Sequence, residues 1–494
     1  MTKDATLDQI GQALMDSTSA FKKYAHTLFS DRATLLRKIA TELEALGDEV
    51  IKQAMQETNL PEARLKGECA RTIFQLNSYA EACEKGDWLE ISIDTANPDR
   101  VPPKPDIRKT KIPLGPVVVF GSSNFPFAYS TAGGDTASAL AAGCTVIVKA
   151  HPAHPLTSNM VALAIKKALK NLSMDENIFI HLHGASNQVG EALVKHSLTK
   201  AVGFTGSYQG GMALFNWANQ RKEPIPVFAE MGSVNPVFLF NEKLSQSIET
   251  VAQQYADSIT LGVGQFCTNP GIIIGVKSSS LNNFIELLGK KISNMAAGKM
   301  LHVGIANAYR DKSKTALAQS NIECIASSQL PNDNISGNPL LAAVDANTFL
   351  SNPLLMEEVF GPFSLVVRCE DISEMGAVAE MLQGQLTSTL IATDEEISQH
   401  KELIDLIASK CGRLILNGVP TGVEVCLSMH HGGPFPSTTD ARFTSVGADA
   451  IKRFARPVSY QNFSNKLLPD ELKNSNPLKM WRIVDNELTK DAIG

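Results

Sequence analysis

Apolar residues in the first sixty positions recur every three or four residues, which is the spacing of one face of an α-helix. Leu35, Leu36, Ile39, Leu43 and Leu46 follow this spacing, and charged residues lie between them. We therefore expect the beginning of the chain to be helical.

The segment after Pro61 is expected to form a helix with a polar face. Arg64, Glu68, Arg71 and Gln75 lie three or four residues apart, so their side chains share one side of that helix. A charged helical face is most often solvated surface. The alternative interpretation is an anion-binding wall of a substrate channel.

From residue 116 to residue 230, short apolar runs alternate with helical or alanine-rich stretches. The runs are Pro116–Phe120, Thr145–Lys149, Ile178–Leu182, Ala201–Phe204 and Pro226–Glu230, and the stretches between them are Thr136–Ala142, Met160–Leu169, Val189–His196 and Met212–Arg221. This alternation predicts a parallel sheet with helices on both faces. Ligands bind beyond the carboxyl ends of the strands in such sheets. Three of these ends have unusual residues, namely Ser122–Asn124, Lys149 and Gly206–Ser207.

A second α/β region is expected from about Asn235 onward. Its strand candidates are Val237–Phe240, Ile272–Val276, Leu365–Val367, Leu390–Ala392 and Leu414–Leu416. The fold class is therefore α/β, with two doubly wound domains. The proline-rich residues 95–103 cannot continue a helix or a central strand, so they indicate a connector or the tip of a projecting hairpin. The part after Ala455 is less regular in pattern.

Composition narrows the class of protein. The chain has 494 residues with 44% hydrophobic and 19% charged positions, which is typical of a globular protein of about three structural units. The net charge of -6 lacks the basic excess of a nucleic-acid binder. Its longest nearly apolar run, residues 139–148, is too short to cross a membrane. No export signal is visible, and eight scattered cysteines without CxxC pairs favour reduced thiols in the cytoplasm.

General catalytic and metal-binding motifs identify no site in this sequence. The sequence has no P-loop, no HExxH and no GxSxG. Histidines occur close together at His151 and His154, at His181 and His183, and at His430 and His431. Hydrogen-bonded histidines explain these pairs more simply than a metal site does, so no metal is expected.

Three further local features are ambiguous when each is taken alone. Cys267 lies in a loop rich in glycine, where a thiol is either accessible to a ligand or buried and inert. Glu230 ends an apolar strand and is either a general base or a structural acid. Residues 203–211 form a strand followed by a glycine-rich turn, which is either a phosphate-binding turn or simply a tight one.

Six short motifs follow one another along the chain. They are Asn124–Pro126, Val148–Lys149, Phe204–Ser207, Ala229–Gly232, Gly264–Cys267 and Glu357–Pro362. In this order they resemble the successive signatures of the aldehyde dehydrogenase superfamily, and the resemblance extends from about Asp31 to Pro457. It implies an oxidoreductase that uses NAD or NADP to convert an aldehyde into a carboxylic acid.

The resemblance also implies roles for individual residues. Cys267 is the expected nucleophile, and the Asn124 amide and the Cys267 backbone N–H are the expected donors to the oxyanion. Glu230 is the expected general base for hydrolysis of the thioester. His431 is expected near the nucleophile, where it would raise the thiolate fraction. Lys149 completes the catalytic set.

Cofactor contacts follow from the same motifs. Lys149 is expected at the adenosine ribose, Gly206 and Ser207 at the pyrophosphate, and Glu358 and Phe360 at the nicotinamide end. Many relatives that prefer NAD have a glutamate three residues after the lysine, and here that position is Pro152. Without a carboxylate there, a 2′-phosphate meets less repulsion. We therefore expect NADP, with NAD as a possible second cofactor, and help from His151 or His154.

The substrate is suggested by stretches that depart from the usual family pattern. Residues 60–65, 133–136, 417–423 and 430–438 are similar to two branches, one oxidising 2-oxoglutarate semialdehyde (2,5-dioxopentanoate) and one, linked to NADP, oxidising long-chain aldehydes. An oxo acid needs cationic partners, for which Arg64 and Arg71 are the candidates and Arg442 a third. A long-chain aldehyde needs an apolar tunnel, which Phe125, Phe127 and Phe266 could line. The arginine face favours the short oxo acid.

The resemblance further divides the chain. Residues 1–87 and 113–232 are the expected cofactor-binding domain and 233–430 the expected catalytic domain. Residues 88–112 and 455–494 are expected to mediate assembly into a homodimer or homotetramer, and 431–454 to return to the cofactor domain. No nucleic-acid or membrane partner is expected. A catalytically silent structural protein is a rival interpretation, against which the presence of Cys267, Glu230 and Asn124 argues.

Overall fold

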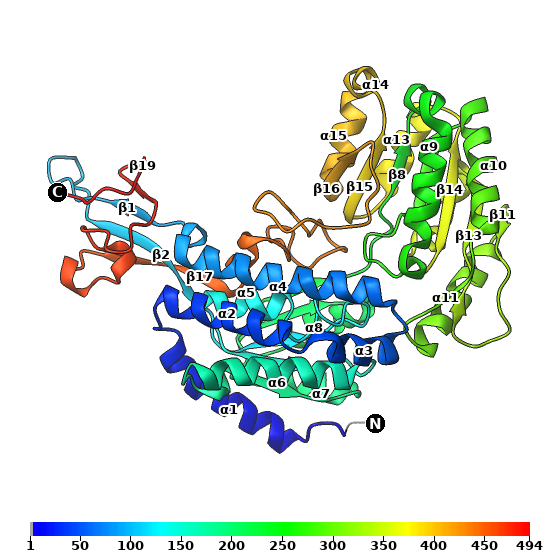
Figure 1. The fold of residues 1–494 in the computed structure, drawn as a ribbon. Helices are drawn as coiled ribbons and strands as arrows, with labels where there is room; N and C mark the ends of the chain where they lie inside the picture. The colour runs from blue at the N-terminus through cyan, green and yellow to red at the C-terminus, as the bar shows by residue number, and fades with distance from the viewer. Residues whose placement is uncertain (1–2) are drawn as a thin grey trace.

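The first sheet of the computed structural model, which describes residues 3–494, has five parallel strands in the order β5-β4-β3-β6-β7 (Figure 1). The strands are β3 (Val117–Phe120), β4 (Val146–Lys149), β5 (Phe179–Leu182), β6 (Ala201–Thr205) and β7 (Val227–Glu230). Each lies within a residue of its predicted position. This order is that of a doubly wound sheet. Successive strands are added on one side of β3 up to β5 and on its other side from β6 onward, so the switch point lies between β3 and β6.

Helices cover both faces of this sheet because its side chains alternate between two apolar clusters. Val117, Val119 and Val148 pack in one cluster, and Val118 and Ile147 pack in the other. The first face is covered by α5 (Gly134–Ala142) and α6 (Pro155–Asn171), with α2 (Phe29–Glu44), α3 (Gly47–Thr58) and α4 (Glu62–Lys85) outside them. The other face is covered by α1 (Leu7–Tyr24), α7 (Asn187–Lys195) and α8 (Tyr208–Asn219). The helical beginning of the chain is confirmed.

The second sheet has seven strands in the order β11-β13-β14-β9-β8-β15-β16. They are β8 (Val237–Leu239), β9 (Ile272–Val276), β11 (Glu323–Ser327), β13 (Leu340–Asp345), β14 (Phe363–Cys369), β15 (Gln385–Ile391) and β16 (Cys411–Leu416). All pair in parallel except β11, which runs antiparallel to β13 at the edge. Five of these strands were expected, whereas β11 and β13 were not.

Helices also lie on both faces of the second sheet. One face packs against α9 (Asn241–Thr260) and α10 (Ser279–Asn294). The opposite face packs against the remaining helices of this region, which are α11 (Val303–Leu317), α12 (Ala346–Ser351), α13 (Ile372–Met381), α14 (Asp394–Gln399) and α15 (Lys401–Ser409). The predicted fold class, two doubly wound α/β units, is confirmed.

The third sheet has five short strands in the order β17-β2-β1-β18-β19 and projects from the body of the molecule (Figure 1). The strands are β1 (Ser92–Asp94), β2 (Ile107–Pro113), β17 (Ala455–Gln461), β18 (Arg482–Val484) and β19 (Glu487–Thr489). β1 and β2 form the antiparallel hairpin that the proline-rich segment suggested. The part after Ala455 is mostly irregular, as expected, but it begins with β17, which pairs with β2 over its whole length.

Two smaller features complete the fold. β10 (Gly298–Lys299) and β12 (Ser336–Gly337) form a separate two-stranded pair, and the 3-10 helix η3 (Leu261–Gly264) precedes the Cys267 loop. Among residues 3–494, no helix is both long and apolar enough to span a membrane.

Candidate active site

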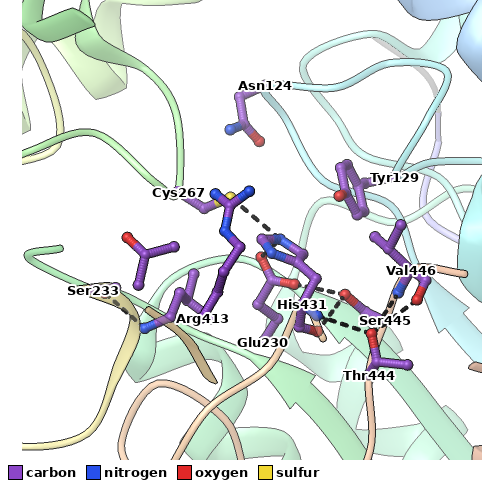
Figure 2. A network of polar contacts seen from close by, with 12 residues as sticks. Asn124, Tyr129, Glu230, Ser233, Cys267, Arg413, His431, Thr444, Ser445 and Val446 are labelled. Carbon is purple, nitrogen blue, oxygen red and sulfur yellow. Dashed lines mark hydrogen bonds and ion pairs between the residues drawn. The ribbon is translucent and has the colours of Figure 1, made fainter. Parts of the chain in front are cut away.

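Cys267, Glu230 and His431 meet between the two large sheets. The Cys267 Sγ lies 3.7 Å from the His431 Nε2, and that same nitrogen lies 3.1 Å from Oε1 of Glu230 (Figure 2). Glu230 is the last residue of β7, Cys267 follows η3, and His431 belongs to the segment that returns toward the first sheet. Three parts of the chain that are distant in sequence therefore place a thiol, an imidazole and a carboxylate in contact.

The return segment holds both Glu230 and His431 by hydrogen bonds. The Ser445 hydroxyl donates to the Glu230 Oε2 at 2.9 Å, and the Ser445 N–H donates to the His431 carbonyl at 2.8 Å. The His431 N–H donates to the Thr444 hydroxyl at 2.9 Å. Because His431 is 1% exposed and Glu230 4% exposed, these bonds satisfy polar groups that water does not reach.

The backbone around Cys267 is fixed by two residues with left-handed conformations. The Asn235 side-chain amide donates to the Cys267 carbonyl and to the Asn269 carbonyl, both at 2.9 Å, while its own φ is 46°. Gly264 has a φ of 64°, and a Cβ there would lie 2.3 Å from backbone atoms of Gly361. Only glycine fits at this close approach.

Asn124 faces the loop that contains Cys267. Its Nδ2 donates to the Gln265 carbonyl at 3.1 Å, and its own backbone carbonyl accepts from Arg64 at 3.1 Å. In Figure 2 the Asn124 amide points toward the sulfur of Cys267. The structure thus brings all of the predicted catalytic residues together except Lys149.

Burial and charge set the protonation of the site. Burial raises the pKa of the Cys267 thiol well above its usual value, and the Glu230 carboxylate raises it further. Burial also acts to raise the pKa of Glu230, but His431 and the Ser445 hydroxyl outweigh this effect, so the net pKa is lowered. Glu230 is therefore an ionised carboxylate next to a protonated thiol at neutral pH.

The polar face of α4 is buried against the Asn124 loop, so its interpretation as solvated surface is wrong. Glu68 is 5% exposed and accepts from the N–H groups of Phe127 and Ala128. Arg64 pairs with Glu68 at 2.6 Å, and its guanidinium carbon lies 4.4 Å from the centre of the Phe125 ring. It also lies 4.9 Å from the Phe266 ring.

An apolar cluster lies beside these aromatic rings. Its buried members are Phe125, Ala128, Tyr129, Val425 and Val446, with Phe266, Val423 and Met429 packed against it. Phe127, the third aromatic residue expected to line a tunnel, is fully buried in the core under the first sheet instead.

Of three further arginines, one lies where it was predicted and two do not. Arg71 donates to the Tyr129 hydroxyl at 3.1 Å and so faces the site, as predicted. Arg442 is an exposed surface residue paired with Asp440 at 2.6 Å, so its assignment to the substrate site is wrong. Arg413 on β16 lies beside Cys267 in Figure 2 and was not predicted. A single arginine in an otherwise apolar strand was the only signal of it in the sequence.

Lys149, Gly206 and Ser207 lie at the carboxyl ends of β4 and β6. The Lys149 Nζ donates to the Gly184 carbonyl at 2.9 Å, and burial lowers the pKa of this lysine to about 8. Ser207 caps α8 by accepting from the Gly210 N–H. The Gly206 N–H donates to the Glu230 carbonyl at 3.0 Å, which ties this turn to the strand that ends at Glu230.

Glu358 and Phe360 line a small cleft together with Phe266 and Ser233. Burial raises the pKa of Glu358 to about 7, and the Ser233 N–H partly opposes this effect. A Cβ on Gly232 would lie 2.6 Å from the Glu358 Oε2, so the two segments approach closely. This cleft adjoins the Cys267 loop through Phe266.

The residues around Pro152 differ in their accessibility. Pro152 is exposed, whereas His154 is fully buried with its Nε2 2.7 Å from the Ser122 carbonyl. His154 is therefore unable to meet a cofactor phosphate, while the half-buried His151 stacks on it at 5.5 Å. His181 and His183 are hydrogen-bonded to Ser158 and Asn159.

Comparison with known proteins extends this picture. Residues 1–457 match the model of the aldehyde dehydrogenase family. The chain is 48% identical to the alpha-ketoglutaric semialdehyde dehydrogenase of Acinetobacter baylyi, covering 99% of this chain and 93% of the relative. It is also 48% identical to alpha-ketoglutaric semialdehyde dehydrogenase 2 of Azospirillum brasilense, over 95% and 89% of the two chains.

Solved structures share the fold. A betaine aldehyde dehydrogenase from Staphylococcus aureus superposes with a TM-score of 0.80 at 18% identity, covering 94% of this chain and 91% of that one. A 3,6-anhydro-L-galactose dehydrogenase in complex with NAP gives a TM-score of 0.78 at 19% identity, over 93% and 92% of the two chains.

Replacing His431 by asparagine removes a group that can hold positive charge 3.7 Å from the Cys267 sulfur. Because an imidazolium stabilises a nearby thiolate, we expect the pH midpoint of Cys267 alkylation by iodoacetamide to rise by about one unit in His431→Asn. Mass spectrometry of the Cys267 peptide measures this midpoint. His430→Asn, at the adjacent histidine, is the control and should leave it unchanged. An equal midpoint in His431→Asn and the native protein would contradict the role of His431.

Proposed function

The chain belongs to the aldehyde dehydrogenase family, and we propose that it oxidises 2,5-dioxopentanoate to 2-oxoglutarate with NADP as the electron acceptor. The observation that supports the chemistry best is the contact of Cys267 and Glu230 with the same His431 nitrogen, beside the Asn124 amide. The substrate is supported by the names of the two relatives at 48% identity.

In the first step, the Cys267 thiolate adds to the aldehyde carbon and forms a thiohemiacetal. The thiol proton leaves to the neighbouring His431, whose Nε2 lies 3.7 Å from the sulfur. Asn124 Nδ2 and the Cys267 N–H donate to the oxyanion that develops on the former carbonyl oxygen. Loss of one such donor costs about 2.7–4 kcal/mol of barrier.

In the second step, the thiohemiacetal loses its C–H hydrogen with the electron pair and becomes a thioester of Cys267. NADP supplies the hydride acceptor when it is bound. Glu230 then removes a proton from water, which attacks the thioester and releases the carboxylic acid and the thiol. An ionised Glu230 fits this base role, and its lowered pKa keeps it ionised at neutral pH.

The residues at the carboxyl ends of the first sheet fit a dinucleotide. We assign Lys149 to the adenosine ribose, Gly206 and Ser207 to the pyrophosphate at the start of α8, and Glu358 and Phe360 to the nicotinamide end. The exposed Pro152, three residues after Lys149, leaves the ribose without a carboxylate neighbour, which supports NADP. NAD remains the second cofactor in this proposal.

The parts of the chain have distinct proposed roles. Residues 1–87 and 113–232 bind the cofactor, 233–430 contribute the nucleophile, and 431–454 return His431 and Ser445 to the first sheet. We propose that the projecting sheet of residues 88–112 and 455–494 mediates a homodimer or homotetramer. All eight cysteines are free thiols, which supports a reducing compartment such as the cytoplasm.

A long-chain aldehyde is the second candidate substrate. It is favoured by the apolar cluster of Phe125, Tyr129 and their neighbours, which could line a tunnel. Arg71, which faces the same space, favours a substrate with a carboxylate instead.

We expect kcat/KM with NADP to be at least about 100-fold higher for 2,5-dioxopentanoate than for decanal. An arginine without an acidic partner binds a carboxylate favourably, whereas a long alkyl chain would leave its charge unpaired. Initial rates of NADPH formation measure both values. A higher kcat/KM for decanal would overturn the proposed substrate but not the aldehyde chemistry.

Glu230→Gln should separate the two chemical steps. Hydride transfer needs no base at Glu230, so a burst of about one NADPH per active site is expected, followed by steady turnover about 100-fold slower or more. Stopped-flow absorbance resolves the two phases. Glu42→Gln, at a buried carboxylate on α2 remote from the site, is the control. If the burst and the steady rate fall equally, Glu230 is not the base for hydrolysis.

Pro152→Glu tests the cofactor proposal. A carboxylate beside the 2′-phosphate adds repulsion, so kcat/KM for NADP should fall by about 10- to 100-fold while that for NAD changes by less than about threefold. Pro152→Gln, which is neutral and of similar size to glutamate, is the matched control and should show neither effect. Equal changes with both cofactors in Pro152→Glu would contradict the position assigned to the 2′-phosphate.

A further inference from the structure

Two guanidinium groups, those of Arg71 and Arg413, face the Cys267 site without a carboxylate partner. Within residues 3–494, no acidic oxygen lies within 4.0 Å of either group. Arg71 comes from α4 and Arg413 from β16, so they approach from different sheets. Both arginines are half-buried, and a cation that is partly removed from water without an anion favours an anionic ligand.

Both arginines have N–H donors that no protein group in the described part of the chain accepts. A guanidinium has five N–H donors. Arg413 uses its two terminal nitrogens on the Gly422 and Pro420 carbonyls at 3.0 and 2.7 Å, and Arg71 uses one on Tyr129. The Nε of each arginine is buried and has no partner.

The two groups face the same space. Burial lowers the pKa of Arg413. Burial also acts to lower the pKa of Arg71, but Tyr129, Glu68 and Cys267 outweigh it, so that pKa is raised; Tyr129 and Cys267 act electrostatically on both arginines. In Figure 2 the guanidinium of Arg413 extends toward the Cys267 sulfur, with Tyr129 nearby. The carbonyls of Gly422 and Pro420 orient this guanidinium, which limits the rotamer freedom lost when a ligand binds.

Arg64, the arginine expected to bind the substrate carboxylate with Arg71, is differently placed. Its charge is paired with Glu68 at 2.6 Å, its Nη2 donates to the Asn124 carbonyl, and its plane is covered by Phe125 and Phe266. A neutralised and covered guanidinium has little attraction for another carboxylate. Its contacts instead hold the loop that presents the Asn124 amide.

We propose that Arg413 and Arg71 together bind the carboxylate of an aldehyde acid whose carbonyl reacts with Cys267, and that Arg64 positions Asn124. This inference rests on the proposed aldehyde oxidation and specifies which residues select its substrate. Arginine forks match the planar carboxylate by paired N–H···O bonds, which a lysine or a single donor cannot reproduce. The carboxylate supplies the counter-charge that both arginines lack.

The test compares 5-oxopentanoate with pentanal, two five-carbon aldehydes that differ in a terminal carboxylate. In Arg413→Met, loss of charge-assisted hydrogen bonds should lower kcat/KM for 5-oxopentanoate by about 100-fold or more. The value for pentanal should fall by less than about tenfold, because pentanal has no carboxylate to lose and only the electrostatic effect of the arginine on the Cys267 thiolate is removed. Arg71→Met should show the same split. Arg442→Met, at the exposed arginine, is the matched control and should change neither value.

Arg413→Lys keeps the positive charge and is the variant to measure if Arg413→Met does not fold. It should raise the KM for 5-oxopentanoate about tenfold and leave the KM for pentanal unchanged. A proportional loss with both aldehydes in either variant would show that Arg413 supports the Cys267 thiolate or the loop, and would overturn the inference. No loss with either aldehyde would also overturn it.

Failure of the proposed function would give a different result from failure of the arginine assignment. If the native enzyme itself oxidises pentanal and decanal better than 5-oxopentanoate and 2,5-dioxopentanoate, the proposed substrate class fails before any variant is examined. If the native enzyme prefers the acids and the arginine variants keep that preference, only the assignment of Arg413 and Arg71 fails.

Discussion

A carboxylate buried beside a thiol is the constraint on which the rest of the site depends. Glu230 and Cys267 would destabilise each other as anions, because burial and mutual repulsion both oppose ionisation. His431 resolves this conflict by placing one nitrogen between the two groups, and Ser445 satisfies the second carboxylate oxygen. The thiol, the imidazole and the carboxylate are therefore close enough together for a proton to pass among them.

That arrangement requires the two large sheets and the return segment to keep fixed relative positions. Ser233, Asn235 and Gln385 form a buried hydrogen-bonded group that connects the segment after β7 to β15 of the second sheet. Asn235 extends the same group to the Cys267 carbonyl. Since each of these polar side chains is at most 5% exposed, breaking one bond leaves its partner unsatisfied. The polar network thus orients the nucleophile as well as joining the sheets.

The fold could be predicted from the sequence wherever the pattern of apolar and polar residues was compatible with only one kind of element. The strands β3 to β7 are short apolar runs between helices, and both of their faces are buried, so periodicity located them within a residue. β13 was missed because Leu340–Asp345 is rich in alanine, which favours helices as much as strands. β17 was missed because its partner β2 lies more than 340 residues earlier, and long-range pairing leaves no local signal. The ordered motifs identified Cys267, Glu230 and Asn124, but only coordinates show that His431 touches both of the first two.

The arginines show most clearly why composition and spacing do not decide function. Arg64 and Arg71 share one face of α4 and are equivalent in the sequence, yet Glu68 forms an ion pair with the first, and no acidic oxygen of residues 3–494 lies within 4.0 Å of the second. Arg413 lies on β16, just before the apolar run Leu414–Leu416 that predicted this strand, and its guanidinium is oriented by two carbonyls of the loop that follows. The role of a cation depends on whether an anion is already present, and that is a property of packing between distant segments. Under the proposed function, an arginine that the fold leaves without an acid next to the nucleophile is the position expected to select substrate charge.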